Sequence, residues 1–255
     1  MKLKHVRNAT MVLELGDQRI LVDPMLGAKG SMDPFPNSAG NSTRNPTTDL
    51  AVPLAELIDV DVVVVTHIHL DHWDNAAASL LPRDVPLLVQ NEADGKAISA
   101  NGFSNVQVLK EPLRIGQTVF TRTAGQHGSD AVLATWPSLG EVSGVVINHP
   151  GEPSIYVAGD TVWNDQVNEA LAEHRPDIVV LNTGEARLPD NSRLIMDAQE
   201  ILEVHAAAPQ ARIVAVHMEA LNHCVVTRAQ VRALVREHQI AEHVLVPEDG
   251  EVLIF

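Results

Sequence analysis

Alternating polar and apolar positions open the chain and predict a meander of three strands at residues 3–7, 10–15 and 19–22. The last of these strands ends in Asp23-Pro24. Residues 26–49 are then rich in Gly, Pro, Ser, Asn and Thr and follow neither the helical nor the strand period. We expect a long loop there, which is either a lid-like binding loop or a disordered surface insertion.

The pattern is regular beyond this loop, where short apolar runs alternate with helical periodicity. Helices are predicted at residues 53–58, 75–81, 92–100, 165–173, 197–207 and 228–238. Strands are predicted at 61–65, 87–89, 106–109, 118–124, 132–136, 142–148, 154–158, 178–181, 212–216, 244–246 and 252–254. Strands followed by helices in both halves, around a strand-rich middle, indicate an α/β fold of two packed sheets covered by helices. We expect a single domain over residues 1–255.

Composition narrows the class of protein. The chain of 255 residues has 45% hydrophobic and 20% charged residues, which is ordinary for a globular enzyme. Its formal net charge of -15 disfavours nucleic acid and favours a small-molecule partner. The single cysteine, Cys224, and the lack of a signal core or membrane span favour a cytoplasmic protein with no membrane association. Whether the chain forms a homo-oligomer stays open.

The stretch VVVVTHIHLDHWD, residues 62–74, places candidate metal ligands directly behind a buried strand. His67 and His69 have the spacing that points both side chains to one side of an extended segment. Asp71 and His72 lie past the turn, where they can bind a second ion or orient the first pair. A polar loop that only caps the strand is the alternative, but four such groups within six positions favour a metal site.

Other polar residues follow later strands. His127 lies in TAGQHG, Asp160 in YVAGDT and His217 in IVAVHMEALNH. By themselves His127 could be an ordinary loop histidine and Asp160 a turn residue. His223 competes with His217 as a ligand, but His217 directly ends a strand, so we prefer it and expect His223 to contact substrate or to support the loop.

The motif HIHLDH resembles the HxHxDH signature of the metallo-β-lactamase superfamily, and the later His, GD and His markers occur in that family's order. The resemblance implies a four-layer αββα sandwich with residues 26–49 as an active-site loop. It also implies two divalent ions, with Zn²⁺ preferred and Mn²⁺ or Fe²⁺ as alternatives. The implied ligands are His67, His69 and His127 for the first ion, Asp71, His72 and His217 for the second, and Asp160 as a bridge.

Two ions that share Asp160 would share a water and lower its pKa toward neutrality, so the resemblance implies a hydrolase. We expect a metal-bridging hydroxide to attack a small-molecule lactone, ester or phosphoester, with Asp71, Asp160 and His223 as the catalytic residues. The chain looks most similar to the ascorbate-6-phosphate lactonase-like group. It departs from that group at Arg7-Asn8-Ala9, where Gly-His-Ala is usual. Asp23 is expected to support a metal-binding histidine.

Three further interpretations remain open at the level of sequence. An iron-dependent sulfur dioxygenase or a thioester hydrolase could use nearly the same ligands. A non-catalytic relative that keeps the fold is disfavoured, because competent residues fill all seven ligand positions.

Asn182 and Glu185 follow a strand and are either rim groups or capping groups. Trp73 is either a pocket wall or a core residue.

Overall fold

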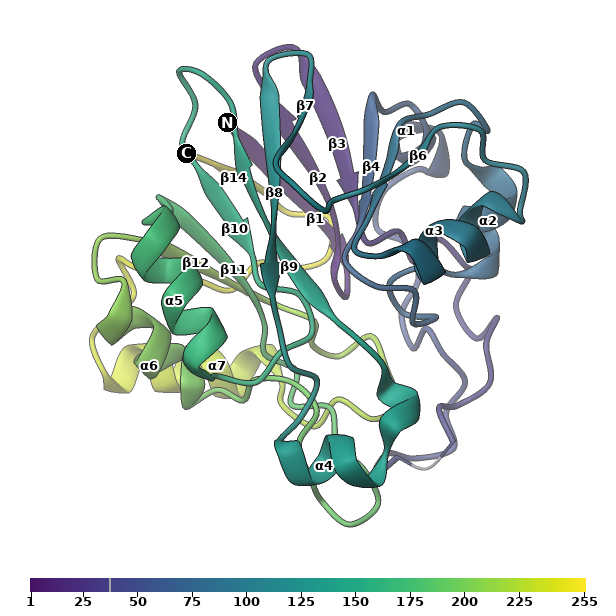
Figure 1. Ribbon diagram of the computed structural model, residues 1–255. Coiled ribbons are helices and arrows are strands. Elements are labelled where there is room, and N and C mark those ends of the chain that lie inside the picture. The colour runs from purple at the N-terminus through teal and green to yellow at the C-terminus, as the bar shows by residue number, and fades with distance from the viewer. Residues whose placement is uncertain (37) are drawn as a thin grey trace.

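Two seven-stranded sheets lie face to face in the computed structural model, which describes residues 1–36 and 38–255 (Figure 1). The first sheet has the order β14-β1-β2-β3-β4-β5-β6. Its strands β14 to β3 pair antiparallel and β3 to β6 pair parallel. Their bounds are β1 Lys2–Arg7, β2 Thr10–Leu15, β3 Gln18–Val22, β4 Val62–Val65, β5 Leu87–Val89, β6 Val106–Val108 and β14 Val252–Ile254.

The second sheet has the order β13-β12-β11-β10-β9-β8-β7. Strands β10 to β13 are parallel and β7 to β10 are antiparallel, so both sheets are mixed. The bounds are β7 Leu113–Ile115, β8 Thr118–Ala124, β9 Ser143–Asn148, β10 Ile155–Val157, β11 Ile178–Asn182, β12 Arg212–Val216 and β13 Val244–Leu245.

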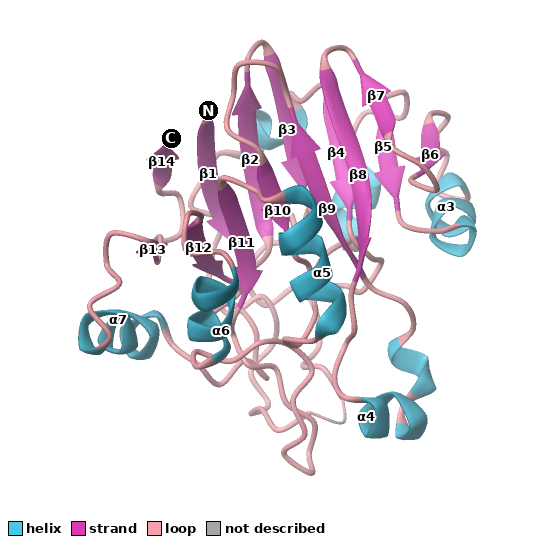
Figure 2. Cartoon of the chain, turned by 60° about the vertical axis from the view of Figure 1, so that its left-hand side comes forward, coloured by secondary structure: helices cyan, strands magenta, loops and turns pink. Residues whose placement is uncertain are grey.

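Three apolar clusters occupy the spaces between the layers. One lies between the sheets and includes Leu13, Val64 and Val214. The second joins the first sheet to α1 (Leu54–Ile58), α2 (Asn75–Leu80) and α3 (Glu92–Ser99). The third joins the second sheet to α5 (Asp165–His174), α6 (Glu200–Ala207) and α7 (Arg228–Glu237), which Figure 2 shows against that sheet. These helix, sheet, sheet and helix layers confirm the predicted αββα sandwich.

Capping groups decide where several helices begin. Asp74 and Asn91 accept hydrogen bonds from the backbone N–H groups of Ala77 and Asp94 at the starts of α2 and α3. Thr227 forms a capping box with Gln230 at α7. Asp74 also accepts the backbone N–H of Gly27 at 2.6 Å. Asp74 therefore joins α2 to the start of the 26–49 loop.

The strand predicted at residues 132–136 is wrong, because the structure has helix α4 (Asp130–Thr135) there, followed by a 3₁₀ turn at Pro137–Leu139. Ser129 caps α4 through the N–H of Val132, and Asp130 favours the first helical turn. The apolar residues of this stretch face a small satellite cluster instead of a sheet. Strand β7 was not predicted from the sequence.

The helix expected from residue 197 begins three positions later, at Glu200. Asp197 accepts the N–H of Glu200 at 2.9 Å, and the Glu200 side chain accepts the N–H of Asp197 at 3.0 Å. This reciprocal pair holds Asp197 outside the helix. Elsewhere the predicted elements are found with their ends moved by a few residues.

The loops that follow β4, β8, β10, β11 and β12 meet at one end of the sandwich, at the lower edge of Figures 1 and 2. Parallel strands end at the same edge of a sheet, so the side chains of the residues that follow them in the sequence converge. Among the described residues, no helix combines the length and the apolar character needed to cross a membrane.

Candidate metal centre

His67 and His69 follow β4 and face each other, as their spacing predicts. Nε2 of His67 lies 3.0 Å from Nδ1 of His69. The His127 ring, from the loop after β8, lies 5.2 Å from the His69 ring and 6.0 Å from the His67 ring between centroids. Nδ1 of His127 bonds to the backbone oxygen of Leu194 at 3.0 Å, which leaves Nε2 for another partner. The three imidazoles thus form one group from two different sheets.

Asp71, His72, Asp160 and His217 form a second group, in which one ligand atom from each residue lies within 4.8 Å of all the others. Nε2 of His72 is 3.1 Å from Asp160 Oδ1, and Nε2 of His217 is 3.2 Å from Asp71 Oδ2. Asp160 also approaches the first group, because its Oδ2 lies 3.9 Å from His67 Nε2. All four residues are buried. Asp160 therefore lies between the two groups.

Buried residues behind the cluster orient these side chains. Asp23, left at the end of β3, receives the N–H and the hydroxyl of Thr66 and lies 2.8 Å from His72 Nδ1. Asn182 donates to Asp160 Oδ1 at 2.7 Å. The expectation that Asp23 supports a cluster histidine agrees with this geometry, and Asn182 is a support of Asp160. Asp23 holds His72 by the ring nitrogen opposite the one that faces Asp160, and Asn182 holds the Asp160 oxygen that faces His72.

His217 has a strained backbone conformation, which its close packing keeps in place. Its φ of 68° lies in the left-handed region, which a non-glycine residue rarely adopts. Its N–H donates to the backbone oxygen of Asn8 at 3.1 Å, and its Nδ1 lies 3.5 Å from the sulfur of Cys224. A Cβ on Gly184 would lie 1.9 Å from the His217 oxygen, so only glycine fits there.

Asn8, the residue at which the sequence departs from the resemblance noted above, lies between two parts of the cluster. Its side chain donates to the backbone oxygen of Asp71 at 3.1 Å, while its own backbone oxygen accepts the N–H of His217. Asn8 thus joins the turn behind β4 to the end of β12. The residue contacts the backbone of two cluster residues and is fully buried.

The charges of the second group balance within the protein. Burial disfavours the charged form of His72, but Asp160, Asp23 and Asp71 outweigh it and raise its pKa to about 10. Burial likewise opposes a charge on His217, but Asp160 and other neighbours raise its pKa well above the ordinary value. Burial raises the pKa of Asp160, but the imidazoles hold it well below its usual range. Protons on these imidazoles therefore supply positive charge beside two carboxylates.

The first group behaves in the opposite way. Burial, with repulsion from His72 and His69, lowers the pKa of His67 well below its ordinary value. Burial also lowers the pKa of His127 to about 4. Both imidazoles are therefore neutral at pH 7, which is the form that binds a metal ion.

The orphaned nitrogens show that this donor set fits divalent metal ions. Nε2 of His72 and Nε2 of His217 are buried and make no directed hydrogen bond to any described residue, although both face carboxylates. Native proteins rarely leave such atoms without a partner. Imidazole nitrogens beside carboxylate oxygens suit zinc, manganese and iron. The protein thus has a cluster of His and Asp residues that can bind metal.

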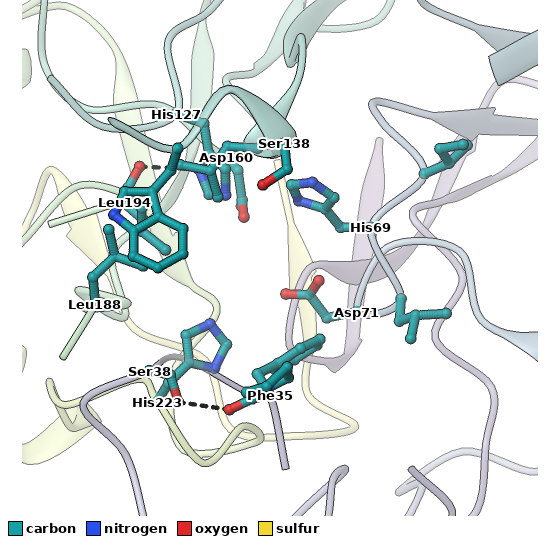
Figure 3. Close-up of a pocket in the computed structure, with 15 residues that line it drawn as sticks. Phe35, Ser38, His69, Asp71, His127, Ser138, Asp160, Leu188, Leu194 and His223 are labelled. Atoms are coloured by element: carbon teal, nitrogen blue, oxygen red, sulfur yellow. Dashed lines mark hydrogen bonds between the residues drawn. The ribbon is translucent and has the colours of Figure 1, made fainter. Parts of the chain in front are cut away.

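The cluster lies at the base of a cavity of about 400 Å³ (Figure 3). His69, Asp71, His127, Asp160 and His223 contribute polar atoms to its surface. The remaining lining residues are mostly apolar, and none of the described lining residues is Lys or Arg. They are Phe35, Pro36, Ser38, Ile68, Leu70, Trp136, Ser138, Leu139, Leu188 and Leu194.

Several of these residues have no signal in the sequence. Leu188, Leu194 and Trp136 come from loops and from the end of α4, so only the fold brings them together. Glu185, which we considered as a rim group, forms an ion pair with Arg187 and is not among the cavity residues. Trp73 packs in the core with its ring centroid 5.5 Å from that of Phe103, so it is a core residue and not a wall of this cavity.

The chain belongs to the β-lactamase superfamily, since the model of the beta-lactamase superfamily domain matches residues 18–218. It is 41% identical over 256 residues to the UPF0173 protein YddR of Bacillus subtilis, and the match covers 100% of both chains. It is also 28% identical over 232 residues to the UPF0173 metal-dependent hydrolase MJ1163 of Methanocaldococcus jannaschii, covering 87% of this chain and 92% of the other.

A solved structure resembles the whole fold. The isothiocyanate hydrolase from Delia radicum gut bacteria is 42% identical, with a TM-score of 0.96 and coverage of 100% of this chain and 99% of that one. The family membership and the similarity to metal-dependent hydrolases confirm the expected class, a metal-dependent hydrolase.

Proposed function

We propose that the protein hydrolyses small, uncharged isothiocyanates, R–N=C=S, at two divalent metal ions. The observation that carries this proposal is the cavity, in which the His and Asp cluster forms the base and apolar side chains form the walls. Such a cavity suits a neutral electrophile with a hydrophobic R group. The 42% identity to an isothiocyanate hydrolase along the whole chain supports the same substrate class.

The proposed ligands follow the two groups in the structure. His67, His69 and His127 would hold one ion, while Asp71, His72 and His217 would hold the other, and Asp160 would bridge them. The 3.0 Å separation of the His67 and His69 nitrogens and the placement of Asp160 between the groups support this division. Zn²⁺ suits the mixed nitrogen and oxygen donors best, and Mn²⁺ or Fe²⁺ are the alternatives.

Two ions in this position would supply a water of lowered pKa and would polarise the substrate. In the reaction, water oxygen bonds to the central carbon and the C–N bond then breaks, so R–NCS and H₂O give R–NH₂ and COS. The nitrogen gains both protons of the water. The apolar walls exclude other water from the electrophilic carbon.

His223 is the residue we assign to proton transfer. It is 8% exposed, it points into the cavity in Figure 3, and its Nδ1 has no partner among the described residues. Burial lowers its pKa, so the imidazole is neutral at pH 7. A neutral imidazole can accept a proton from water and pass it to the departing nitrogen. Asp71 and Asp160, the other two proposed catalytic residues, would hold the ions and orient the attacking water.

The lining disfavours the phosphorylated substrates that we considered from sequence. A sugar-phosphate lactone or a phosphoester carries negative charge, and the described lining residues include no cation to receive it. The net charge of -15 adds to the repulsion. Uncharged esters and lactones remain compatible with the cavity and belong in the test panel.

The test measures turnover of benzyl isothiocyanate by protein loaded with Zn²⁺, Mn²⁺ or Fe²⁺. We expect loss of the N=C=S absorbance, with benzylamine and carbonyl sulfide formed in equal amounts. The double variant with His67→Ala and His69→Ala should lose this activity. No turnover with any of the three metals, or equal turnover by the double variant, would refute the proposal. Oxygen consumption during turnover would instead indicate a dioxygenase.

A further inference from the structure

Asn222 directs nearly all of its hydrogen bonds to the loop at residues 26–49. Its Oδ1 accepts the N–H of Phe35 at 3.2 Å and the side-chain amide of Asn45 at 2.8 Å. Its Nδ2 donates to the backbone oxygen of Asn41 at 2.9 Å and to the hydroxyl of Ser38 at 3.4 Å. Its backbone N–H donates to Asn45 Oδ1 at 2.8 Å. Asn222 therefore fastens four separate points of this loop.

The backbones of the two segments also touch. A Cβ on Gly40 would lie 1.9 Å from the backbone oxygen of Asn222 and 2.8 Å from the Cα of His223. No side chain fits in that space, so Gly40 permits the approach. Asn222 itself is 6% exposed, and the fastening is therefore part of the protein interior.

This contact places an aromatic ring on the cavity. Phe35, whose N–H is held by Asn222, lies edge-on against the ring of His223, with 4.8 Å between centroids and 74° between planes. Both rings line the cavity, on the side away from His69 and His127 in Figure 3. His223 follows Asn222 directly in the chain. The Asn222 side chain therefore holds Phe35 beside the His223 ring.

We propose that Asn222 determines substrate specificity by holding Phe35 against His223, where the pair forms the wall that receives the organic group of the substrate. Aromatic and bulky R groups gain from this wall, while a methyl group is too small to use it. The identity of the reacting group rests on the proposed function above. The fastening of the loop rests on the contacts alone.

The variant Asn222→Ala removes the side-chain bonds. We expect KM for benzyl isothiocyanate to rise about tenfold, equivalent to ~1.4 kcal/mol, which is the size of one aromatic contact. KM for methyl isothiocyanate should change less than twofold, and kcat and metal content should stay near those of the unaltered protein. Asn91→Ala is the matched control, because Asn91 also forms side-chain hydrogen bonds, to Asp94 and Glu141, but lies outside the cavity lining.

A double-mutant cycle with Phe35→Ala tests whether Asn222 acts through Phe35. If it does, the double variant should raise the benzyl KM no further than the larger single effect. Hydrogen exchange at the Phe35 amide should also become faster in Asn222→Ala. Additive effects, or an equal rise of KM for both substrates, would overturn the proposal. A loss of kcat alone would show a purely structural role and would overturn it as well.

Binding of unreactive benzylthiourea separates this proposal from the proposed function. If the unaltered protein binds benzylthiourea but turns over no isothiocyanate, the proposed function fails and Asn222 is still tested. A dissociation constant about tenfold weaker in Asn222→Ala then supports the specificity role. An unchanged dissociation constant, or no binding to the unaltered protein, overturns it.

Discussion

The variant Asp23→Asn tests the metal centre through a residue that would touch no metal. Oδ1 of Asp23 accepts the N–H of Thr66 at 2.7 Å, and Oδ2 accepts from the Thr66 hydroxyl and lies 2.8 Å from His72 Nδ1. An amide at the Oδ2 position offers N–H groups where His72 needs an acceptor. The Thr66 hydroxyl can turn and accept, but the imidazole can accept at Nδ1 only if its proton moves to Nε2.

His72 then has two choices, and both weaken metal binding. It can keep its proton on Nδ1 and lose the bond, or move the proton to Nε2, the nitrogen that faces Asp160 at 3.1 Å. A protonated Nε2 cannot bind metal. Removal of such a support typically weakens metal affinity ~10–100-fold, equivalent to ~1.4–2.8 kcal/mol. We expect the affinity for one of the two ions to fall by this factor.

The assay is a titration of metal-free protein with Zn²⁺ against a competing chelator. Asp177→Asn is a matched control, since Asp177 likewise accepts the N–H and the hydroxyl of one residue, Ser154, but has no histidine beside it. The control should bind both ions as the unaltered protein does. If folded Asp23→Asn binds both ions with unchanged affinity, then Asp23 does not orient a ligand and His72 is not one.

Three other variants have defined outcomes. Asp160→Ala should retain the fold by circular dichroism but contain at least one metal equivalent fewer by elemental analysis, and full metal content would contradict the bridging role. Gly40→Ala should force the loop from Asn222 and raise the benzyl isothiocyanate KM as Asn222→Ala does, and an unchanged KM would show that the contact yields without cost. Burial lowers the pKa of His5, so its neutral form stabilises the fold above its unfolded pKa and this stability is lost as pH falls, by at most ~1.4 kcal/mol per pH unit. The variant His5→Gln should therefore lose less stability between pH 7 and pH 5 than the unaltered protein, as measured by thermal unfolding. An equal loss would exclude His5 as a cause.

Much of the His and Asp cluster could be predicted from the sequence because several of its residues closely follow strands. His67, Asp160 and His217 come one to three residues behind β4, β10 and β12, whose ends the parallel pairing brings to one edge. The apolar runs before them are strong local signals. Position after a strand made these side chains candidates, and the order of the metallo-β-lactamase markers selected them from the other polar residues.

Local signals failed where tertiary contacts decide. Residues 132–136 have enough apolar and β-branched character to suggest a strand, but the Ser129 cap and a satellite cluster make them helical. The loop at 26–49 has no period, and its role depends on bonds to distant residues such as Asn222 and Arg7. The composition of this loop was equally consistent with a binding loop and with disorder. Phe35, Pro36 and Ser38 of the loop line the cavity, which favours a binding loop.

By itself the sequence determined the layered fold, the family and the side chains that gather at the strand ends. It could do so because strand periodicity and short motifs act over a few neighbouring residues. Only the tertiary structure decided which histidine Asp23 contacts and which apolar residues line the cavity. Asp23 meets His72 across 49 positions, and Phe35 meets Asn222 across 187. Contacts over such separations leave no local pattern, because the chain brings their partners together only when both sheets have packed.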